Sequence, residues 1–287
     1  MRSGYIIERY DSMTGAYTCN RLCEEGRRLG MDVSIIGMQD TCAADGRLFN
    51  RGGELTHRDF CVIRHRPNVI RDCVCSLADR SYNDAVLFDR YLNKARQIRD
   101  IRSDSMRIPA HVLSTSNTDF DALADRLGVP FVAKGLEGSR GDQIHLVTCD
   151  GDYERLQHDF GPAKEWLFEE FVSESRGRDL RVYSVRGEPV ACMQRSNDRD
   201  FRANFALGAV LRPHEITPEI REIASDVYGC TDLDVVGIDL LFGKDSFVFC
   251  EANVMPGIRG IEGVTGVNVA GAVMGMIAED RDGQDRG

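Results

Sequence analysis

The sequence lacks the long hydrophobic runs that a membrane protein needs. None of its uninterrupted apolar stretches approaches the roughly 20 residues of a transmembrane helix. The N-terminus, MRSGYIIERYDSM, reaches charged residues too early for a secretory signal peptide. Repeats and low-complexity linkers are also missing. Hydrophobic residues make up 42% and charged residues 29% of the 287 residues, so we expect a soluble, cytoplasmic globular protein.

An overall excess of basic residues is absent as well. The formal net charge is −10, which argues against general nucleic-acid binding because that function normally requires a basic surface. The charge is uneven, however. Residues 47–107 contain thirteen Lys and Arg residues against eight Asp and Glu residues, a local balance of +5. This segment is either a solvated helix surface or a binding patch, and the first interpretation is favoured.

The ten cysteines lack the spacing of a disulfide scaffold or a zinc site. Cys19 and Cys23 have helical spacing, and the pair Cys73 and Cys75 has no second pair at a zinc-site distance. The chain is long enough to bury a sizeable core without disulfides. We therefore expect buried thiols in a reducing compartment. The six histidines show no metal or catalytic spacing either.

Strand-like and helix-like segments alternate along the chain, which indicates an α/β arrangement. One strongly helical segment, residues 82–101, is expected to begin at Asn83 or Asp84. Another helix is expected to have Thr217 as its cap and Pro218 as its first residue, and to end at Gly229. A β-hairpin is expected in residues 178–196, and a second one in residues 233–254.

The second hairpin carries polar residues on one face, in the segment FVFCEANVMPG (residues 247–257). Folding it about Lys244 and Asp245 pairs positions whose numbers add up to about 490. Residues directly opposite one another then point to the same face, with Cβ atoms roughly 5 Å apart. The expected pairs are Asp239 with Glu251, Leu241 with Phe249, and Gly237 with Asn253.

Two opposed carboxylates destabilise a sheet unless a cation lies between them. Asp239, Glu251 and the amide oxygen of Asn253 form a hard oxygen set, which suits Mg²⁺ or Mn²⁺ rather than Zn²⁺. Alternatively, both acids point to solvent from an exposed sheet face, and the pattern alone leaves both interpretations open. A register slip of one residue would also separate the three donors.

Other polar residues form weaker signals along the chain. Lys134 ends an apolar strand and precedes the loop GLEGSRG, whose Gly135, Gly138 and Gly141 allow backbone N–H groups to face phosphate, although a plain hairpin turn would look the same. Lys94 alone reads as a surface residue of an arginine-rich helix.

Two further pairs have the alternating spacing of an extended segment. Asp179 and Arg181 could hold a ribose hydroxyl and a phosphate, or could pair with one another or with unrelated neighbours. Arg202 and Asn204 place a cation and an amide on one side of the segment DFRANFALGA.

Taken in order, these motifs resemble those of the RimK-like carboxylate–amine ligases of the ATP-grasp superfamily. The resemblance is clearest over residues 83–278 and includes NK (93–94), PFVAKGLEGSRG, EEFV with RDLRV, DFRAN, GIDLL and EANVMPGIRGIEGVTGVNVAG. It implies an α+β fold, the ATP-grasp fold, in which two α+β lobes clasp ATP. The implied domains are a small α/β pre-ATP-grasp domain (residues 1–95), a central lobe with the glycine-rich lid loop (96–172) and a C-terminal lobe with the metal site (173–287).

The resemblance also implies a role for each matching residue. Those implied to bind ATP are Lys94 and Lys134 at the phosphates, Glu170 and Phe171 at the adenine, Asp179 at the ribose, and Arg202, Ala203 and Asn204 along the phosphates. Asp239, Glu251 and Asn253 would hold two Mg²⁺ or Mn²⁺ ions. Arg181 and Arg202 would be the catalytic cations, with Arg181 steadying the phosphorylated carboxylate.

The implied reaction is ATP-dependent amide formation through an acyl phosphate, on an amino acid or a peptide. A phosphotransferase and a catalytically silent nucleotide-binding regulatory module remain as alternatives. The arginine-rich first part, with IRHRP (residues 63–67) and Arg71, could hold an acidic substrate. Relatives of this kind often self-associate, so a homo-oligomer stays open. The segment FALGA replaces a basic residue and paired glycines of the relatives, so the resemblance does not specify the substrates.

Overall fold

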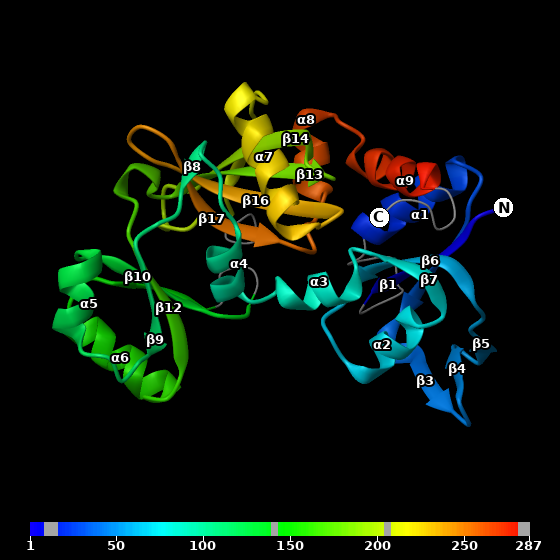
Figure 1. Ribbon diagram of the computed structural model, residues 1–287, viewed down its shortest axis with the longest axis horizontal. Helices are drawn as coiled ribbons and strands as arrows, with labels where there is room; N and C mark the ends of the chain where they lie inside the picture. The colour runs from blue at the N-terminus through cyan, green and yellow to red at the C-terminus, as the bar shows by residue number, and fades with distance from the viewer. Residues whose placement is uncertain (9–16, 139–142, 204–207, 281–287) are drawn as a thin grey trace.

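A four-stranded parallel sheet occupies the N-terminal part of the chain (Figure 1). The computed structural model describes residues 1–8, 17–138, 143–203 and 208–280. The sheet has the order β2-β1-β6-β7 and is connected through two helices. Its elements are β1 (Ser3–Glu8), α1 (Tyr17–Arg28), β2 (Asp32–Gly37), β6 (Arg58–Arg64), α2 (Val69–Cys75) and β7 (Ala78–Tyr82). A short 3-10 helix, η1 (Met38–Asp40), leads into a small antiparallel sheet of β3 (Thr41–Ala44), β4 (Arg47–Asn50) and β5 (Gly53–Glu54).

A second, antiparallel sheet forms a separate lobe at the lower left of Figure 1. Its order is β11-β10-β12-β9, and two helices cover one of its faces. Its elements are β9 (His111–Thr115), α5 (Phe120–Leu127), β10 (Phe131–Gly135), β11 (Ile144–Val147), α6 (Asp150–Phe160) and β12 (Glu165–Glu170). Phe131, Trp166 and Phe168 pack against the two helices in a hydrophobic cluster that belongs to this lobe alone. We refer to it as the central lobe.

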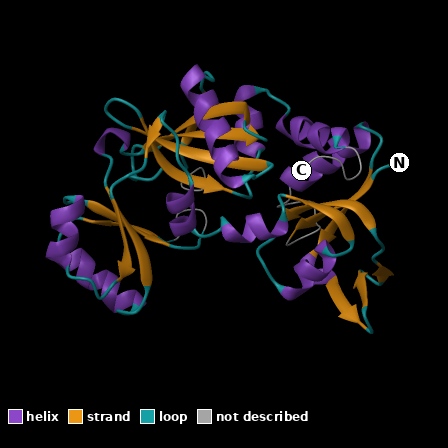
Figure 2. Cartoon of the chain, in the orientation of Figure 1, coloured by secondary structure: helices purple, strands orange, loops and turns teal. Residues whose placement is uncertain are grey.

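A six-stranded sheet makes up the C-terminal part, in the order β15-β14-β13-β16-β17-β8. All of its pairs are antiparallel except β17 with β8. Its elements are β8 (Met106–Arg107), η2 (Ser173–Ser175), β13 (Arg178–Val185), β14 (Glu188–Ser196), β15 (Val210–Pro213), α7 (Pro218–Thr231), β16 (Val235–Phe242), β17 (Phe247–Asn253), α8 (Arg259–Thr265) and α9 (Val269–Glu279). Figure 2 shows the three lobes as mixtures of helix and strand, which confirms the expected α+β class.

The helix expected over residues 82–101 is wrong as a single element. It is divided into α3 (Ala85–Arg90) and α4 (Lys94–Asp100). Asp84 caps α3 as expected, but Asn93 starts a new helix by accepting hydrogen bonds from the backbone N–H groups of Ala95 at 3.0 Å and Arg96 at 3.2 Å. Short polar side chains compete with the helical backbone in this way, so Asn93 favours a helix start over a helix interior.

The expected start of α7 is confirmed, and its expected end is wrong. The Thr217 hydroxyl accepts from the Ile220 N–H at 3.3 Å, with Pro218 as the first helical residue. The helix continues through Gly229 to Thr231 and ends where Asp232 adopts a left-handed conformation with a φ of 53°. Aspartate tolerates that conformation, so the helix does not need a glycine to stop it.

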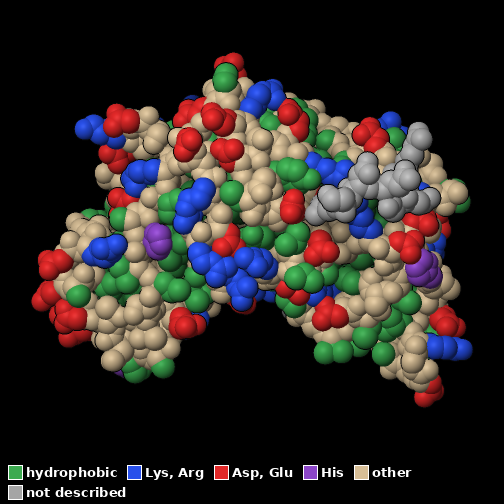
Figure 3. All heavy atoms as spheres, in the orientation of Figure 1, with side chains coloured by type: hydrophobic (Ala, Val, Ile, Leu, Met, Phe, Trp, Pro, Cys, Tyr) green, Lys and Arg blue, Asp and Glu red, His purple; other side chains and the backbone are tan. Residues whose placement is uncertain are grey.

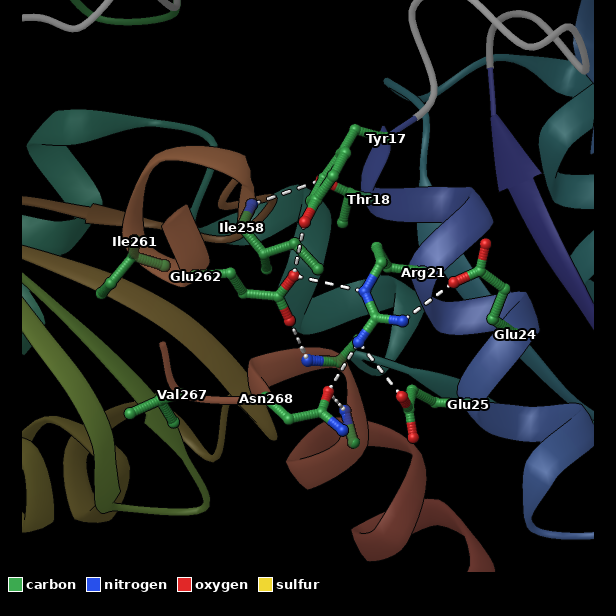
Figure 4. A network of polar contacts seen from close by, with 12 residues as sticks. Tyr17, Thr18, Arg21, Glu24, Glu25, Ile258, Ile261, Glu262, Val267 and Asn268 are labelled. Carbon is green, nitrogen blue, oxygen red and sulfur yellow. Dashed lines mark hydrogen bonds and ion pairs between the residues drawn. The ribbon is translucent and has the colours of Figure 1, made fainter. Parts of the chain in front are cut away.

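The segment that follows β17 is tied to α1 (Figure 4). Arg21 on α1 pairs with Glu262 on α8 at 3.4 Å and donates to the Asn268 side chain at 2.9 Å, at the start of α9. The Tyr17 hydroxyl donates to Glu262 at 3.0 Å. The Thr18 hydroxyl accepts from the Ile258 N–H at 3.3 Å. Helices α8 and α9 therefore join the parallel sheet to the six-stranded sheet, with apolar residues of both buried between them.

All ten cysteines are free, as expected, but only Cys19, Cys23, Cys61 and Cys192 are buried. Among the described helices, none is long and apolar enough to cross a membrane by itself. Helices α8 and α9 meet the criteria of length and composition only as a pair, and they are bent by 110° at their junction.

Candidate active site

The expected pairing of the polar residues in the second hairpin is confirmed. Asp239 lies opposite Glu251, and Gly237 lies opposite Asn253. A β-bulge follows Asp239, so Phe249 faces Leu240 rather than Leu241, and that expected pair is wrong. The bulge leaves Cys250 as the extra residue of β17. Because the irregularity begins beyond Asp239, the slip does not reach the polar end of the hairpin.

Asp239 is buried beneath two arginines. Arg181, on β13, donates from both Nε and Nη2 to its carboxylate, and the bond from Nη2 measures 2.7 Å. Arg195, on β14, lies 2.9 Å from the same carboxylate. Burial raises the pKa of Asp239, but the two arginines lower it by more, so its pKa lies below the usual range. Asp239 therefore does not point to solvent, in contrast to the alternative interpretation of the hairpin.

Arg195 was not found in the sequence, although it organises the site. It makes two hydrogen bonds to Asp179, of 2.6 and 2.7 Å, in addition to its contact with Asp239. Burial raises the pKa of Asp179 to about 6, and Arg195 opposes that shift. Asp179 and Arg181 do not pair with one another: Asp179 pairs with Arg195 on β14, and Arg181 pairs with Asp239 on β16.

Arg195 has a signal in the sequence that was not used. A hairpin turned by Arg186, Gly187 and Glu188 pairs positions whose numbers add up to 374, which places Arg195 opposite Asp179, as in the structure. A second bulge, beside Tyr183, shifts the pairing only on the turn side, where Ser184 faces Pro189.

A pocket lies between the central lobe and the six-stranded sheet. Its lining residues come from both lobes and include apolar and charged side chains. The lining residues are Val132, Lys134, Ile144, Glu169, Glu170, Phe171, Val172, Ser175, Arg178, Asp179, Phe201, Arg202, Ala203, Leu241 and Cys250. A pocket that combines apolar side chains with charged ones, three of them cations, suits a flat heterocycle that carries a polar, anionic tail.

Lys134 is the buried cation of this pocket. Its Nζ lies 2.5 Å from Glu169 and 3.4 Å from the carbonyl oxygen of Cys250. Burial lowers the pKa of Lys134, but Cys250, Glu169 and Glu251 raise it by more, so it stays charged. Glu169, 3% exposed, is a second residue that the sequence analysis missed. Strand alternation could have found it. Glu169 faces Val132 across the sheet, and Val132 lies two residues from Lys134 on the same face of β10. Glu169 therefore points to the pocket side, as Lys134 does.

The last residue of β12, Glu170, and the residue after it, Phe171, both line the pocket. The Glu170 carboxylate turns away from the pocket, accepting from the Ala110 N–H at 2.7 Å and pairing with Arg107. The Phe171 ring meets Phe201 edge to face, with centroids 6.3 Å apart. The Glu170 carboxylate is thus held by protein donors, while Phe171 supplies an aromatic surface.

Lys94 is buried beside the polar hairpin, so its interpretation as a surface residue is wrong. Its side chain is 7% exposed, and Nζ lies 3.3 Å from Glu251. Its backbone N–H donates to the Leu136 carbonyl at 2.9 Å, next to the glycine loop. The division of residues 82–101 into two helices makes Lys94 the first residue of α4 and aims it at this strand.

Arg202 and Ala203 also line the pocket, and Arg202 pairs with Asp200 at 2.8 Å. Asn204 and the loop residues 139–142, including Gly141, lie outside the described residues. The position of the predicted lid loop is therefore known only up to Gly138.

The oxygen donors of the polar hairpin have the chemistry that a hard divalent cation prefers, and in this structure protein donors engage all three. Asp239 contacts Arg181 and Arg195, Glu251 contacts Lys94, and Asn253 Oδ1 accepts from the Met255 N–H at 2.9 Å. Asp239 and Glu251 are direct cross-strand partners, and Asn253 lies two residues farther on the same face. In the described part of the chain, no three His, Cys, Asp or Glu side chains gather as a metal site. The candidate site therefore depends on two carboxylates and one amide oxygen, a donor set that Mg²⁺ accepts.

The basic segment consists largely of ion pairs. Arg71 is 1% exposed and contacts Asp72 and Asp89, so it does not offer an anion-binding site. Arg90 and Arg99 both pair with Asp100, at 2.6 and 2.7 Å. Figure 3 shows Lys and Arg side chains gathered in the notch between the lobes, near α4 in Figure 1. Many arginines of this segment are therefore neutralised by carboxylates, some within the segment and others outside it, such as Asp32 for Arg58 and Glu170 for Arg107.

Comparison with known families identifies the chain's relatives. A family model described as the RimK-like ATP-grasp domain matches residues 91–277. The chain belongs to the RimK-like ATP-grasp family. Over 277 residues it is 29% identical to a probable alpha-L-glutamate ligase of Thioalkalivibrio sulfidiphilus, with 92% of each chain covered.

Two other relatives have similar names. The chain is 31% identical, over 276 residues, to a probable alpha-L-glutamate ligase of Xanthomonas euvesicatoria, covering 90% of this chain and 92% of that one. It is 29% identical to the ribosomal protein bS6–L-glutamate ligase of Escherichia coli, with 91% of each covered.

Solved structures agree on the fold. The ATP-grasp ligase PsnB, in complex with a minimal precursor, superposes with a TM-score of 0.72 at 15% identity, covering 96% of this chain and 99% of that one. The macrocyclase MdnC of Microcystis aeruginosa gives 0.73 at 13% identity, covering 97% and 100%. The predicted family, the ATP-grasp fold and the reaction class, an ATP-dependent C–N ligase, are confirmed.

Proposed function

We propose that this RimK-like enzyme joins an amino acid through its amine to the carboxylate of a peptide or protein, consuming ATP. Glutamate is the amino acid that the names of its relatives suggest, and bS6 is a protein substrate named for one of them. The free cysteines are compatible with action in a reducing cytoplasm.

The single observation that carries this proposal is the cross-strand pair of Asp239 and Glu251 beside the pocket that Lys134 enters. In the first step, a carboxylate oxygen attacks the γ-phosphorus of ATP, and the bond from that phosphorus to the β,γ-bridging oxygen breaks to release ADP. In the second step, the amine nitrogen attacks the acyl phosphate carbon, and the C–O bond breaks. The electron pair leaves with phosphate, and the amine proton passes to solvent or a basic group.

The chain's own residues act by holding charges in place rather than by covalent chemistry. Lys134 and Lys94 would neutralise phosphate oxygens, with Arg202, Ala203 and Asn204 along the triphosphate. Phe171 and the Glu170 backbone would hold the adenine, and Asp179 the ribose. Arg181, which already binds the Asp239 carboxylate, would stabilise the negative charge that develops on the reacting carboxyl group.

Asp239, Glu251 and Asn253 would hold two Mg²⁺ ions. When bound, these ions would neutralise charge on the phosphates and reduce their repulsion of the carboxylate. We also propose the division given by the sequence, with residues 1–95, 96–172 and 173–287 as the three domains.

The test is to incubate the protein with Mg-ATP, L-glutamate and a library of peptides that end in acidic residues. ADP release and a peptide mass increase of one glutamyl residue are expected. Release of ADP with a phosphorylated acceptor and no amide would indicate a phosphotransferase instead. Nucleotide binding without turnover on any acceptor would indicate a regulatory module.

A further inference from the structure

Arg64 lies at the carboxyl end of β6 in the parallel sheet, opposite Glu8 at the end of β1. In open parallel sheets, ligands bind in the crevice outside the carboxyl ends of the strands. Here that edge faces the segment that follows the metal-site strand, because Arg64 Nη1 donates to the Pro256 carbonyl at 3.1 Å. Arg64 thus reaches from the N-terminal sheet to the end of the EANVMPG motif.

The guanidinium of Arg64 has capacity for a further acceptor. Its side chain is 11% exposed, and its Nε is buried without a hydrogen-bond partner among the described residues. The carboxylate that faces it, Glu8, stays 3.9 Å away, which is beyond hydrogen-bond distance. A buried donor without an acceptor is costly, and an arginine fork is suited to a carboxylate.

A buried Nε alone does not mark a site, because Arg58 at the other end of β6 has one too. Arg58, however, already binds a carboxylate, since its Nη1 donates to Asp32 at 2.7 Å. Among the described residues, Arg64 meets the Pro256 carbonyl, the Cys19 side chain and, at 3.9 Å, the Glu8 carboxylate, and none of these is a carboxylate within hydrogen-bond distance. The two arginines of β6 therefore differ in whether a carboxylate already occupies the guanidinium: one does at Arg58, and none lies within hydrogen-bond distance at Arg64.

The position of Arg64 relative to the nucleotide pocket indicates which substrate it would meet. Three residues that alternate along β13, Asp179, Arg181 and Tyr183, point to one face. Asp179 lines the nucleotide pocket, Arg181 binds Asp239, and Tyr183 lines a small cavity together with Arg64. At a rise of about 3.3 Å per residue, that cavity lies roughly 13 Å along the strand from the nucleotide side.

We propose that Arg64 binds the α-carboxylate of the amine-donating amino acid, an inference that rests on the proposed ligase function. The carboxylate that becomes phosphorylated must lie against ATP, at Asp239 and Arg181. The second substrate approaches from the side away from the nucleotide, and its own carboxylate stays ionised throughout. A charge in that position requires a fixed cation of its own, which Arg64 supplies.

The test compares Arg64→Gln, Arg64→Lys and the matched control Arg58→Gln in steady-state ligation with L-glutamate or its α-amide as the amine donor. Arg64→Gln should raise the KM for glutamate about 10- to 100-fold, as expected for losing a charge-assisted pair, and should change the KM for ATP less than twofold. The wild type should prefer glutamate over its α-amide, and Arg64→Gln should lose that preference. Arg58→Gln should leave both KM values unchanged.

Arg64→Lys separates an effect on substrate binding from an effect on folding. Lysine keeps the positive charge and a donor for the Pro256 carbonyl, but it lacks the paired N–H groups of a guanidinium that bind a carboxylate. It should keep the wild-type melting temperature with an intermediate KM for glutamate. An unchanged glutamate KM in Arg64→Gln, or an equal rise in the KM for ATP, would overturn the proposal. If the wild type forms no amide at all, the ligase function itself fails, so the two failures are distinguishable.

Discussion

The side chain of Arg181 passes over Gly237, where a Cβ would lie only 3.1 Å from Arg181 Cδ and 2.8 Å from the Cβ of Pro256. Gly237 stands opposite Asn253, two residues before Asp239. The absence of a side chain at Gly237 therefore lets Arg181 reach its carboxylate and lets the Pro256 turn close over the strand.

Gly237→Ala should displace Pro256 and Arg181 and lower kcat by at least tenfold, since a misplaced catalytic cation loses most of its effect on the transition state. Steady-state kinetics would measure this effect. Gly229→Ala is the control, because a Cβ at that position of α7 meets nothing within 4 Å. That control should retain full activity and gain about 0.5 to 1 kcal/mol of stability. Normal turnover in Gly237→Ala would show that the position of Arg181 is not critical.

Glu251→Gln should abolish turnover while the protein stays folded. The substitution keeps the shape of the side chain but removes one anionic oxygen donor and the ionic partner of Lys94, which lies 3.3 Å away. Calorimetric titration should show weaker binding of Mg-ATP, with an unchanged circular dichroism spectrum. Asp245→Asn, at the exposed turn of the same hairpin, also removes one negative charge and should change neither turnover nor Mg-ATP binding. Full ATP-dependent activity of Glu251→Gln would refute the metal assignment.

Lys134→Ala should weaken ATP binding strongly and also destabilise the fold. It removes the buried partner of Glu169, and breaking a buried ion pair typically costs about 3 to 5 kcal/mol. The double variant Lys134→Ala with Glu169→Gln should recover much of the stability, because the stranded charge is gone, but not the ATP affinity. Denaturant unfolding and nucleotide titration of the same samples separate the two effects. Recovery of ATP binding in the double variant would exclude Lys134 as a phosphate ligand.

Asp280 should stabilise the fold in a pH-dependent manner. Burial raises its pKa, but Arg186, Tyr82 and Arg80 lower it by more, to about 2 from a usual 3.8. A depressed carboxyl pKa contributes stability above the unfolded value, and this contribution is lost as the pH falls toward 2. Asp280→Asn should therefore cost about 1 to 2 kcal/mol at pH 7, and the difference from the wild type should shrink between pH 4 and 2. A difference that is constant with pH would contradict an ionic role.

The sequence predicted those parts of the site that depend on strand alternation. The pairing of Asp239 with Glu251 followed from counting residues about one turn, and ordered motifs indicated the family. What counting could not supply were the two bulges, each of which changes which side chains meet. Arg195 was not hidden by a bulge, because a turn centred on Gly187 already places it opposite Asp179. Its further contact with Asp239, across three strands, is a relation that only the folded sheet reveals.

Lys94 is a second residue whose position the sequence did not predict, in this case on a helix. Its sequence context, surrounded by arginines, is typical of a solvated surface. Only the start of a new helix at Asn93 turns it toward Glu251, and a single capping asparagine is a weak signal within a strongly periodic segment.

The connection of α1 to α8 and α9 has a consequence for how the enzyme works. The parallel and six-stranded sheets are held together by a shared hydrophobic cluster and by the contacts of Arg21. Arg64 lies on the first of these sheets and Asp239 on the second. The spacing between the two sites is therefore set by this shared core, and not by the central lobe, which has a hydrophobic cluster of its own.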